Sequence, residues 1–197
     1  GMGASRQDVN VSVRGGRRVE IKGVPQAGWA PRLVHGEAWR QTNLLRLRDE
    51  LHGRGFRGSY DVRVETADVT GFVGSSSLAP LRSESWEWFV RSQNRRPGFE
   101  LGQGPFRVLA VRLPGLAGTL AWPTQPGRTF ADELRGRVRV VAGLDQPPIL
   151  FHSEAWPREA GEHLVRLRAT ARCGDNDGLV LVWGPERDVH TAADEIR

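Results

Sequence analysis

Apolar and polar side chains alternate strictly on both sides of a Gly15-Gly16 pair near the start of the chain. Three valines occupy alternate positions before the glycines, and Val19 and Ile21 do so after them. A period of two places each set on one face of a strand, and a glycine pair lets the chain reverse. The segment is therefore predicted to form an antiparallel hairpin with one apolar and one polar face.

The same alternation limits the register of this hairpin. A two-residue loop would set the apolar face of one strand against the polar face of the other, whereas a three- or five-residue loop keeps apolar opposite apolar. In the three-residue register Asn10 faces Glu20 and Asp8 faces Lys22; in the five-residue register Asn10 faces Lys22. Either register gathers these four side chains on the polar face.

Two interpretations of this polar face remain open from spacing. Two carboxylates, an amide and a lysine are suited to holding Mg²⁺ and a nucleotide phosphate. Asp8 and Lys22 are equally suited to an ordinary cross-strand ion pair on a solvated face. Such pairs are common on half-buried strands, so spacing alone favours the ion pair.

Residues 31–53 are predicted to form an amphipathic helix. Pro31 suits a first helical turn, and Gly53 suits the position after the last. Leu33, Leu44 and Leu47 follow helical spacing, so this face is expected to pack on the apolar face of the hairpin. The glycine-rich stretch that follows is the best candidate for a domain boundary.

The remainder alternates irregularly between short strand and helix patterns. Strands are predicted at residues 60–64, 106–113, 138–141, 149–151 and 178–183. Helices are predicted around residues 86–90 and at 129–134, 159–171 and 185–196, with residues 115–127 as a loop interrupted by prolines. The turns suit antiparallel pairing, so the fold class is predicted to be α+β, with helices packed on a mixed, mainly antiparallel sheet.

A formal net charge of +5 and a pI of about 10.7 favour a polyanionic partner. Lys22 is the only lysine, however, and so strong an arginine bias also fits the coding bias of a GC-rich genome. No apolar run reaches the ~18 residues of a membrane helix, and no basic stretch followed by an apolar segment suggests secretion. A single cysteine is compatible with the cytoplasm.

Other chemistry-bearing residues give weaker signals. No histidine has a metal-binding spacing and Cys173 has no partner cysteine, so no zinc site is expected. His152, Ser153 and Glu154 alternate between faces and are not expected to form a catalytic triad; Ser153 is expected to cap a turn. No phosphate-binding glycine loop is present. The seven tryptophans are expected to pack in the core or at a domain junction.

An arginine strip is a second candidate site. Arg135, Arg137 and Arg139 would share one face of the strand predicted near Val138. The strip could contact nucleic-acid phosphates or be a solvated face, and the pattern favours neither.

Several motifs resemble the B/E subunit family of the glutamyl-tRNA(Gln) amidotransferase. RQDVNVSVRGGRRVEIKGV resembles the motif that closes the family's catalytic cradle, and the Glu37 to Leu51 pattern is similar to its next helix. VRVETADVTG, AVRLPGLAGTL, QPGRTFADELRGRVRV and FHSEAWP resemble the aspartyl-tRNA-synthetase-like insertion, the GAD domain. DNDGLVLVWGPERDVHTAADEIR resembles its closing strand and helix. The resemblance implies a cradle remnant over residues 1–55 and a GAD-like insertion over 56–197.

In that family the cradle uses ATP and Mg²⁺ to phosphorylate the glutamyl group of Glu-tRNA(Gln). Ammonia from a partner amidase or asparaginase-like subunit then gives Gln-tRNA(Gln). The resemblance implies that Asp8, Asn10, Glu20 and Lys22 lie at or near the nucleotide and metal pocket. The family's larger N-terminal cradle segment and C-terminal tRNA-gripping domains have no counterpart in this sequence.

We therefore expect no complete catalysis and no cofactor for the chain alone, with ATP and Mg²⁺ belonging to the parent enzyme. A tRNA(Gln)-binding or architectural role in the subunit is predicted. The alternative is a structural or protein-interaction domain without RNA affinity.

Overall fold

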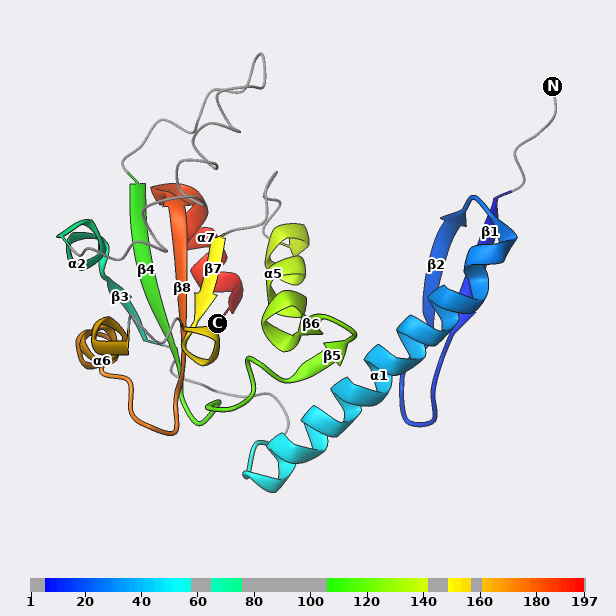
Figure 1. Cartoon of the computed structure of the whole chain (residues 1–197), viewed down its shortest axis with the longest axis horizontal. Coiled ribbons are helices and arrows are strands. Elements are labelled where there is room, and N and C mark those ends of the chain that lie inside the picture. The colour runs from blue at the N-terminus through cyan, green and yellow to red at the C-terminus, as the bar shows by residue number, and fades with distance from the viewer. Residues whose placement is uncertain (1–5, 58–64, 76–105, 142–148, 157–160, 197) are drawn as a thin grey trace, which may run out of the picture. The chain divides into compact units, whose positions relative to one another are not determined.

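The computed structural model describes residues 6–57, 65–75, 106–141, 149–156 and 161–196 (Figure 1). The chain divides into two compact units. The first contains residues 1–60 and 122–130, and the second contains residues 61–121 and 131–197. The strand predicted at 60–64 and the helix predicted around 86–90 lie outside the described residues.

The first unit begins with the predicted hairpin. Strand β1 (Gln7–Val11) pairs antiparallel with β2 (Val19–Val24). Asn10 lies opposite Glu20 and Val11 opposite Val19, which is the register expected for a three-residue loop. Keeping apolar residues opposite one another therefore correctly excluded the two-residue loop, and the structure decides for three residues over five.

A short 3-10 turn, η1 (Ala27–Trp29), leads into helix α1 (Ala30–Gly53), which confirms the predicted helix. α1 packs against β1, as expected, but its buried side chains are Gln41, Asn43 and Leu47. Two of these three are amides, where apolar residues were predicted. They can be buried because Gln41 donates to the Val11 carbonyl and Asn43 donates to the Thr124 carbonyl.

Residues 115–127 were predicted to lack regular structure, and this was wrong at their end. β5 (Pro123–Gln125) pairs with β6 (Arg128–Thr129) in a short hairpin that contacts α1. Pro123 is tolerated because it is the first residue of its strand, where a missing N–H costs least. Gly127 has a φ of 70° and supplies the turn.

The second unit is built on a four-stranded antiparallel sheet in the order β3-β4-β8-β7 (Figure 1). Its strands are β3 (Thr66–Asp68), β4 (Phe106–Leu113), β8 (Gly178–Pro185) and β7 (Ile149–His152). The last three confirm the strands predicted from their apolar runs. With the helices below, they also confirm the α+β fold class.

Helices cover both faces of this sheet. One face, with Leu109 and Val111, packs against α5 (Phe130–Val141) and α7 (Glu186–Ile196). The opposite face, with Val108 and Ala110, packs against α6 (Gly161–Thr170) and α2 (Thr70–Ser75). Alternate residues of β4 thus enter two separate apolar cores, which explains why its sequence reads as a continuous apolar run.

The strand predicted near Val138 was wrong, because these residues continue α5 to Val141. The local Val-rich sequence suggests a strand, but Ala131 and Val138 lie two turns apart on the same face of the helix and are both buried in the core. Packing of this face on the sheet outweighs the weak strand preference of valine.

Trp86 and Trp88 lie outside the described residues, and the tryptophans whose side chains are described divide into two groups. Trp122 donates its indole N–H to the Asn43 carbonyl at 3.1 Å, and Trp156 packs on the second core, as expected of packing residues. Trp29 and Trp39 are 49% and 48% exposed, so they are not core residues, and packing at a domain junction stays a prediction for them. No helix in the described parts of the chain is long and apolar enough to cross a membrane.

Candidate functional site

The polar face of the first hairpin brings three of its four predicted residues into direct contact. Lys22 Nζ lies 3.0 Å from Glu20 Oε1 and 3.6 Å from Asp8 Oδ2. Asn10 lies opposite Glu20 in the strand register. The lysine therefore bridges two carboxylates on an open face.

A bulge places Asp8 beside Lys22. Gln7 pairs with Val24, so β2 carries one extra residue at this point, and Gly23 takes a φ of 71°. The Gly23 N–H donates to Asp8 Oδ1 at 3.1 Å. Only glycine adopts this conformation without strain, so the G in the sequence IKGV fixes where the Asp8 carboxylate lies.

The electrostatics of this face favour a permanent cation. The pKa of Lys22 is raised, first by its hydrogen bond to Glu20 and then by the negative charges of Glu20 and Asp8. Lys22 is 69% exposed and Asp8 46%, so water screens the pair. The ammonium remains protonated, and with its two carboxylate partners it forms a solvent-exposed cluster with a formal charge of −1.

The donor set is incomplete for a metal ion. No group of three or more His, Cys, Asp or Glu side chains that could hold a metal occurs among the described residues. The hairpin supplies two carboxylates, and both are already held by Lys22. Mg²⁺ needs about six oxygen ligands, with water or phosphate supplying several. Two carboxylates are too few for a magnesium site, and their charge opposes contact between Lys22 and a phosphate unless a further cation is bound.

The arginine strip is not a strand face. Arg135, Arg137 and Arg139 lie on α5, where each residue turns by about 100°. Arg135 and Arg139 fall on one side of the helix, and Arg137 points away from them. Arg135 lies 3.8 Å from Asp132, and Arg137 lies 3.3 Å from Glu195. The predicted common face therefore does not form.

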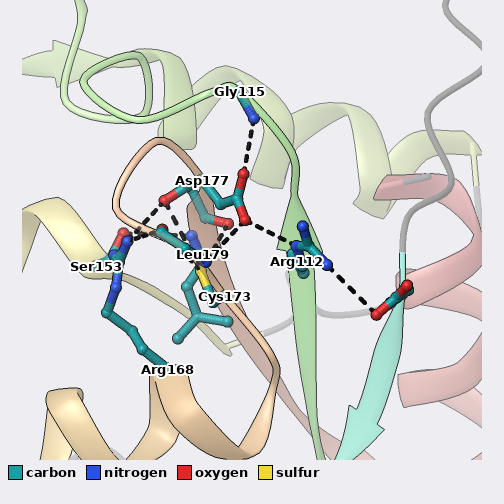
Figure 2. Close-up of polar contacts among 10 residues, drawn as sticks. Arg112, Gly115, Ser153, Arg168, Cys173, Asp177 and Leu179 are labelled. Carbon is teal, nitrogen blue, oxygen red and sulfur yellow. Dashed lines mark hydrogen bonds and ion pairs between the residues drawn. The ribbon is translucent and has the colours of Figure 1, made fainter.

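Asp177 is the centre of a polar network that the sequence patterns did not reveal (Figure 2). Its carboxylate accepts hydrogen bonds from Arg112 Nε at 2.8 Å, the Gly174 N–H at 2.8 Å and the Gly115 N–H at 3.0 Å. Arg112 also reaches Glu65 at 3.5 Å. Burial pushes the pKa of Asp177 upward, but the hydrogen bonds outweigh it and the pKa is lowered.

The rest of this network supports a structural role. Arg168 donates to the carbonyls of Gly174 and Asp177, which fixes the turn before β8 (Figure 2). Cys173 Sγ lies 3.8 Å from the Gly178 carbonyl oxygen, and burial raises the pKa of its thiol. A thiol with a raised pKa is a poor nucleophile. Cys173 is therefore a packing residue, partly buried against the second apolar core.

His152, Ser153 and Glu154 form no triad, as expected. Ser153 Oγ accepts a hydrogen bond from the Leu179 N–H at 3.3 Å. Glu154 accepts from the N–H groups of Gly118 and Ala121, both at 2.7 Å. Burial lowers the pKa of His152. These residues join η2 (Ser153–Ala155) to the sheet and to the loop after β4.

Gln41 of α1 braces the end of the hairpin, a role that its residue type did not predict. Its side-chain amide donates to the Val11 carbonyl at 3.3 Å and accepts from the Val13 N–H at 3.2 Å. It also donates to Glu37 at 3.0 Å. Gln41 is only 6% exposed, so these bonds are made away from water.

Replacing Gln41 with leucine is expected to cost about 1–3 kcal/mol, because two backbone groups lose their partner where water reaches them poorly. Urea unfolding should report the loss, and hydrogen exchange should show faster exchange of the Val13 amide. Gln26→Leu changes an exposed glutamine of the same unit and should shift stability by no more than ~0.5 kcal/mol. Equal effects of the two variants would contradict the bracing role.

The first 139 residues match the family model described as the GatB/GatE catalytic domain. That match covers more than half of the 197 residues. The chain belongs to the GatB/GatE family. Within this GatB/GatE match lie both hairpins of the first unit, α1 and most of α5.

Relatives in the GatB/GatE family are similar along the whole chain. The E-type subunit of glutamyl-tRNA(Gln) amidotransferase from Methanopyrus kandleri is 37% identical over 100% of this chain and 28% of its own length. The E-type subunits from Caldivirga maquilingensis and Pyrococcus horikoshii are 34% and 33% identical, over 94% and 100% of this chain and 26% and 28% of their own length. The chain thus spans about a quarter of these relatives.

Proposed function

We propose that this chain is part of the subunit that converts Glu-tRNA(Gln) to Gln-tRNA(Gln), where it contributes tRNA binding or subunit architecture. The family match over residues 1–139 carries this proposal. Similarity to E-type subunits along the whole chain supports it. The parent enzyme would act in the cytoplasm with ATP, Mg²⁺ and an amidase or asparaginase-like partner.

In this proposal the polar face of the hairpin contributes to the pocket for the nucleotide. Lys22 would contact a phosphate through its exposed ammonium, and Mg²⁺ bound with the nucleotide would offset the charge of the two neighbouring carboxylates. Asp8 and Glu20 would hold Lys22 in position, and Asn10 would offer an amide beside Glu20. Further ligands for a magnesium ion would come from outside the described residues.

We also propose that residues 56–197 correspond to the GAD-like insertion suggested by their motifs. The antiparallel sheet with helices on both faces is compatible with such a domain. The match to the catalytic domain continues to residue 139, past the proposed boundary at 55/56. The insertion assignment therefore rests on the motif resemblance and on the residues after 139.

The alternative is a structural or protein-interaction domain with no RNA affinity of its own. The many ion-paired arginines favour this alternative, because a guanidinium that already holds a carboxylate contributes less net charge to a phosphate. The positive net charge of +5 favours RNA binding.

Selectivity among tRNAs separates the two roles. Fluorescently labelled tRNA(Gln), tRNA(Glu) and an unrelated tRNA should be titrated with the purified 197-residue chain at one salt concentration near physiological. The tRNA-binding role predicts the tightest binding to tRNA(Gln). Equal affinities for all three would show RNA binding without recognition of tRNA(Gln), and no binding above background would leave an architectural role.

A further inference from the structure

The connection between β1 and β2 is the most basic segment of the described hairpin. Residues 12–19 contain three arginines and no acidic residue. All three, Arg14, Arg17 and Arg18, are exposed, and none makes an ion pair with another described residue. We refer to these three residues and the two glycines between them as the arginine loop.

Several arginines elsewhere in the described parts of the chain have acidic partners. Arg48 pairs with Asp49, Arg54 with Glu50, Arg107 with Glu186 and Arg112 with Asp177. The hairpin's own carboxylates, Asp8 and Glu20, are held by Lys22. The charge of the arginine loop is therefore not neutralised within its own hairpin.

The loop is also held in a defined shape. The Gly16 N–H donates to the Val13 carbonyl at 2.9 Å, and Gly15 takes a φ of 83°. Gln41 holds the backbone just before the turn through Val11 and Val13. A Cβ on Gly16 would come within 2.6 Å of Gln41 Oε1, so the loop lies directly on α1. A preorganised loop loses less conformational entropy when it binds.

We propose that the arginine loop binds the phosphate backbone of RNA. Guanidinium groups are planar donors that match phosphate oxygens, and they stay charged at any physiological pH. Arg14 precedes the two glycines in the chain, and Arg17 and Arg18 follow them. This spacing lets three cations approach successive phosphates, while the glycines leave no side chain in the way. The proposal rests on the tRNA-handling function above and assigns it a surface.

A charge-matched pair of triple variants tests the proposal. The test variant is Arg14→Gln, Arg17→Gln and Arg18→Gln. The control is Arg57→Gln, Arg172→Gln and Arg187→Gln, three exposed arginines that likewise make no ion pair with a described residue. Both lower the formal net charge by three. Thermal melts should show that both remain folded, because surface changes of this kind shift stability by about 0.5 kcal/mol each or less.

Labelled tRNA(Gln) transcript is the probe, at about 150 mM monovalent salt. Loss of three phosphate contacts predicts affinity weaker by on the order of 10- to 100-fold for the test variant. The control should change affinity by about threefold or less, because diffuse charge contributes little when salt screens it. A triple Arg→Lys variant at the loop should recover most of the affinity.

Other outcomes overturn the proposal in distinguishable ways. If the unmodified chain binds tRNA and the loop variant binds as well as the control, the loop proposal fails and tRNA binding stands. If the unmodified chain binds no tRNA even at about 50 mM salt, the tRNA-binding role fails together with the loop. If polyglutamate displaces the RNA as effectively as unlabelled RNA of equal charge, the loop recognises carboxylates, as on an acidic protein surface.

Discussion

Replacing Asp177 with alanine is expected to lower the free energy of unfolding of the second unit by about 2–4 kcal/mol. The carboxylate is almost completely buried, with 9% of the side chain exposed, and accepts hydrogen bonds from Arg112 and two backbone N–H groups. Its removal leaves those donors without an acceptor where water has little access. Urea unfolding followed by circular dichroism is the direct measurement.

Asp175→Ala is the matched control for this variant. Asp175 lies two residues away in the same turn and is exposed, so its loss should change stability by no more than ~0.5 kcal/mol. Similar losses for Asp175→Ala and Asp177→Ala would show that the turn needs acidic residues in general and that the Asp177 network is not the cause.

Acid should remove the same stabilisation from the unmodified chain. The folded-state pKa of Asp177 is lowered, since its hydrogen bonds outweigh the opposing effect of burial. The stabilisation by its charge is therefore fully present above the unfolded-state pKa and is lost as pH falls through the lower folded-state pKa. The stability difference between the unmodified chain and Asp177→Asn should shrink over this acidic range. A difference that stays constant with pH would contradict the assignment.

Leu167→Ala is expected to cost about 2–5 kcal/mol. Leu167 has no exposed surface and joins α6 to the sheet face formed by Val108, Ala110, Leu179 and Leu181. Alanine would leave a cavity between the helix and the sheet, and close packing of the strands limits how far they can move to fill it. A lower urea midpoint with an unchanged slope should report this loss.

Val165→Ala, two residues earlier on α6, is the control. Val165 is 68% exposed, so little burial is lost, and alanine has the higher helix propensity. Its stability should stay within ~0.5 kcal/mol of the unmodified chain. A Leu167→Ala loss below ~1 kcal/mol would mean that α6 is not anchored by this core.

The sequence alone predicted those helices and strands in which apolar residues recur at one clear spacing. The period of two in residues 9–21 predicts the hairpin and narrows its register, because a slip by one residue would expose every apolar side chain. The helical spacing of residues 31–53 predicts α1. The end of α5 was missed because its valines favour a strand locally, and only the sheet beneath Val138 decides for a helix.

Some polar contacts could likewise be predicted from a local pattern, and others could not. Asp8, Asn10, Glu20 and Lys22 could be grouped from the sequence because strand alternation alone places them on one face. The bulge at Gly23 could not, since its position depends on how the hairpin ends pair. Asp177 takes its donors from β4, from the loop after it and from the turn before β8, segments that only the folded sheet brings together.

Gln41 shows the same limit on a helix. A glutamine on an amphipathic helix is expected to face water. Gln41 is buried here because the end of the hairpin lies against it, and its side-chain amide bonds the Val11 carbonyl and the Val13 N–H. Val13 and Gln41 are 28 residues apart in the chain, so no local pattern connects them.

The salt dependence of tRNA binding tests the central claim most directly. The dissociation constant of the unmodified chain for labelled tRNA(Gln) should be measured from about 50 to 200 mM monovalent salt. Contact of three or more arginines with phosphates predicts affinity that weakens by at least about tenfold over this range, with a linear log–log plot. Affinity that stays within about twofold, or no binding at the lowest salt, would contradict a tRNA-binding role and leave the architectural one.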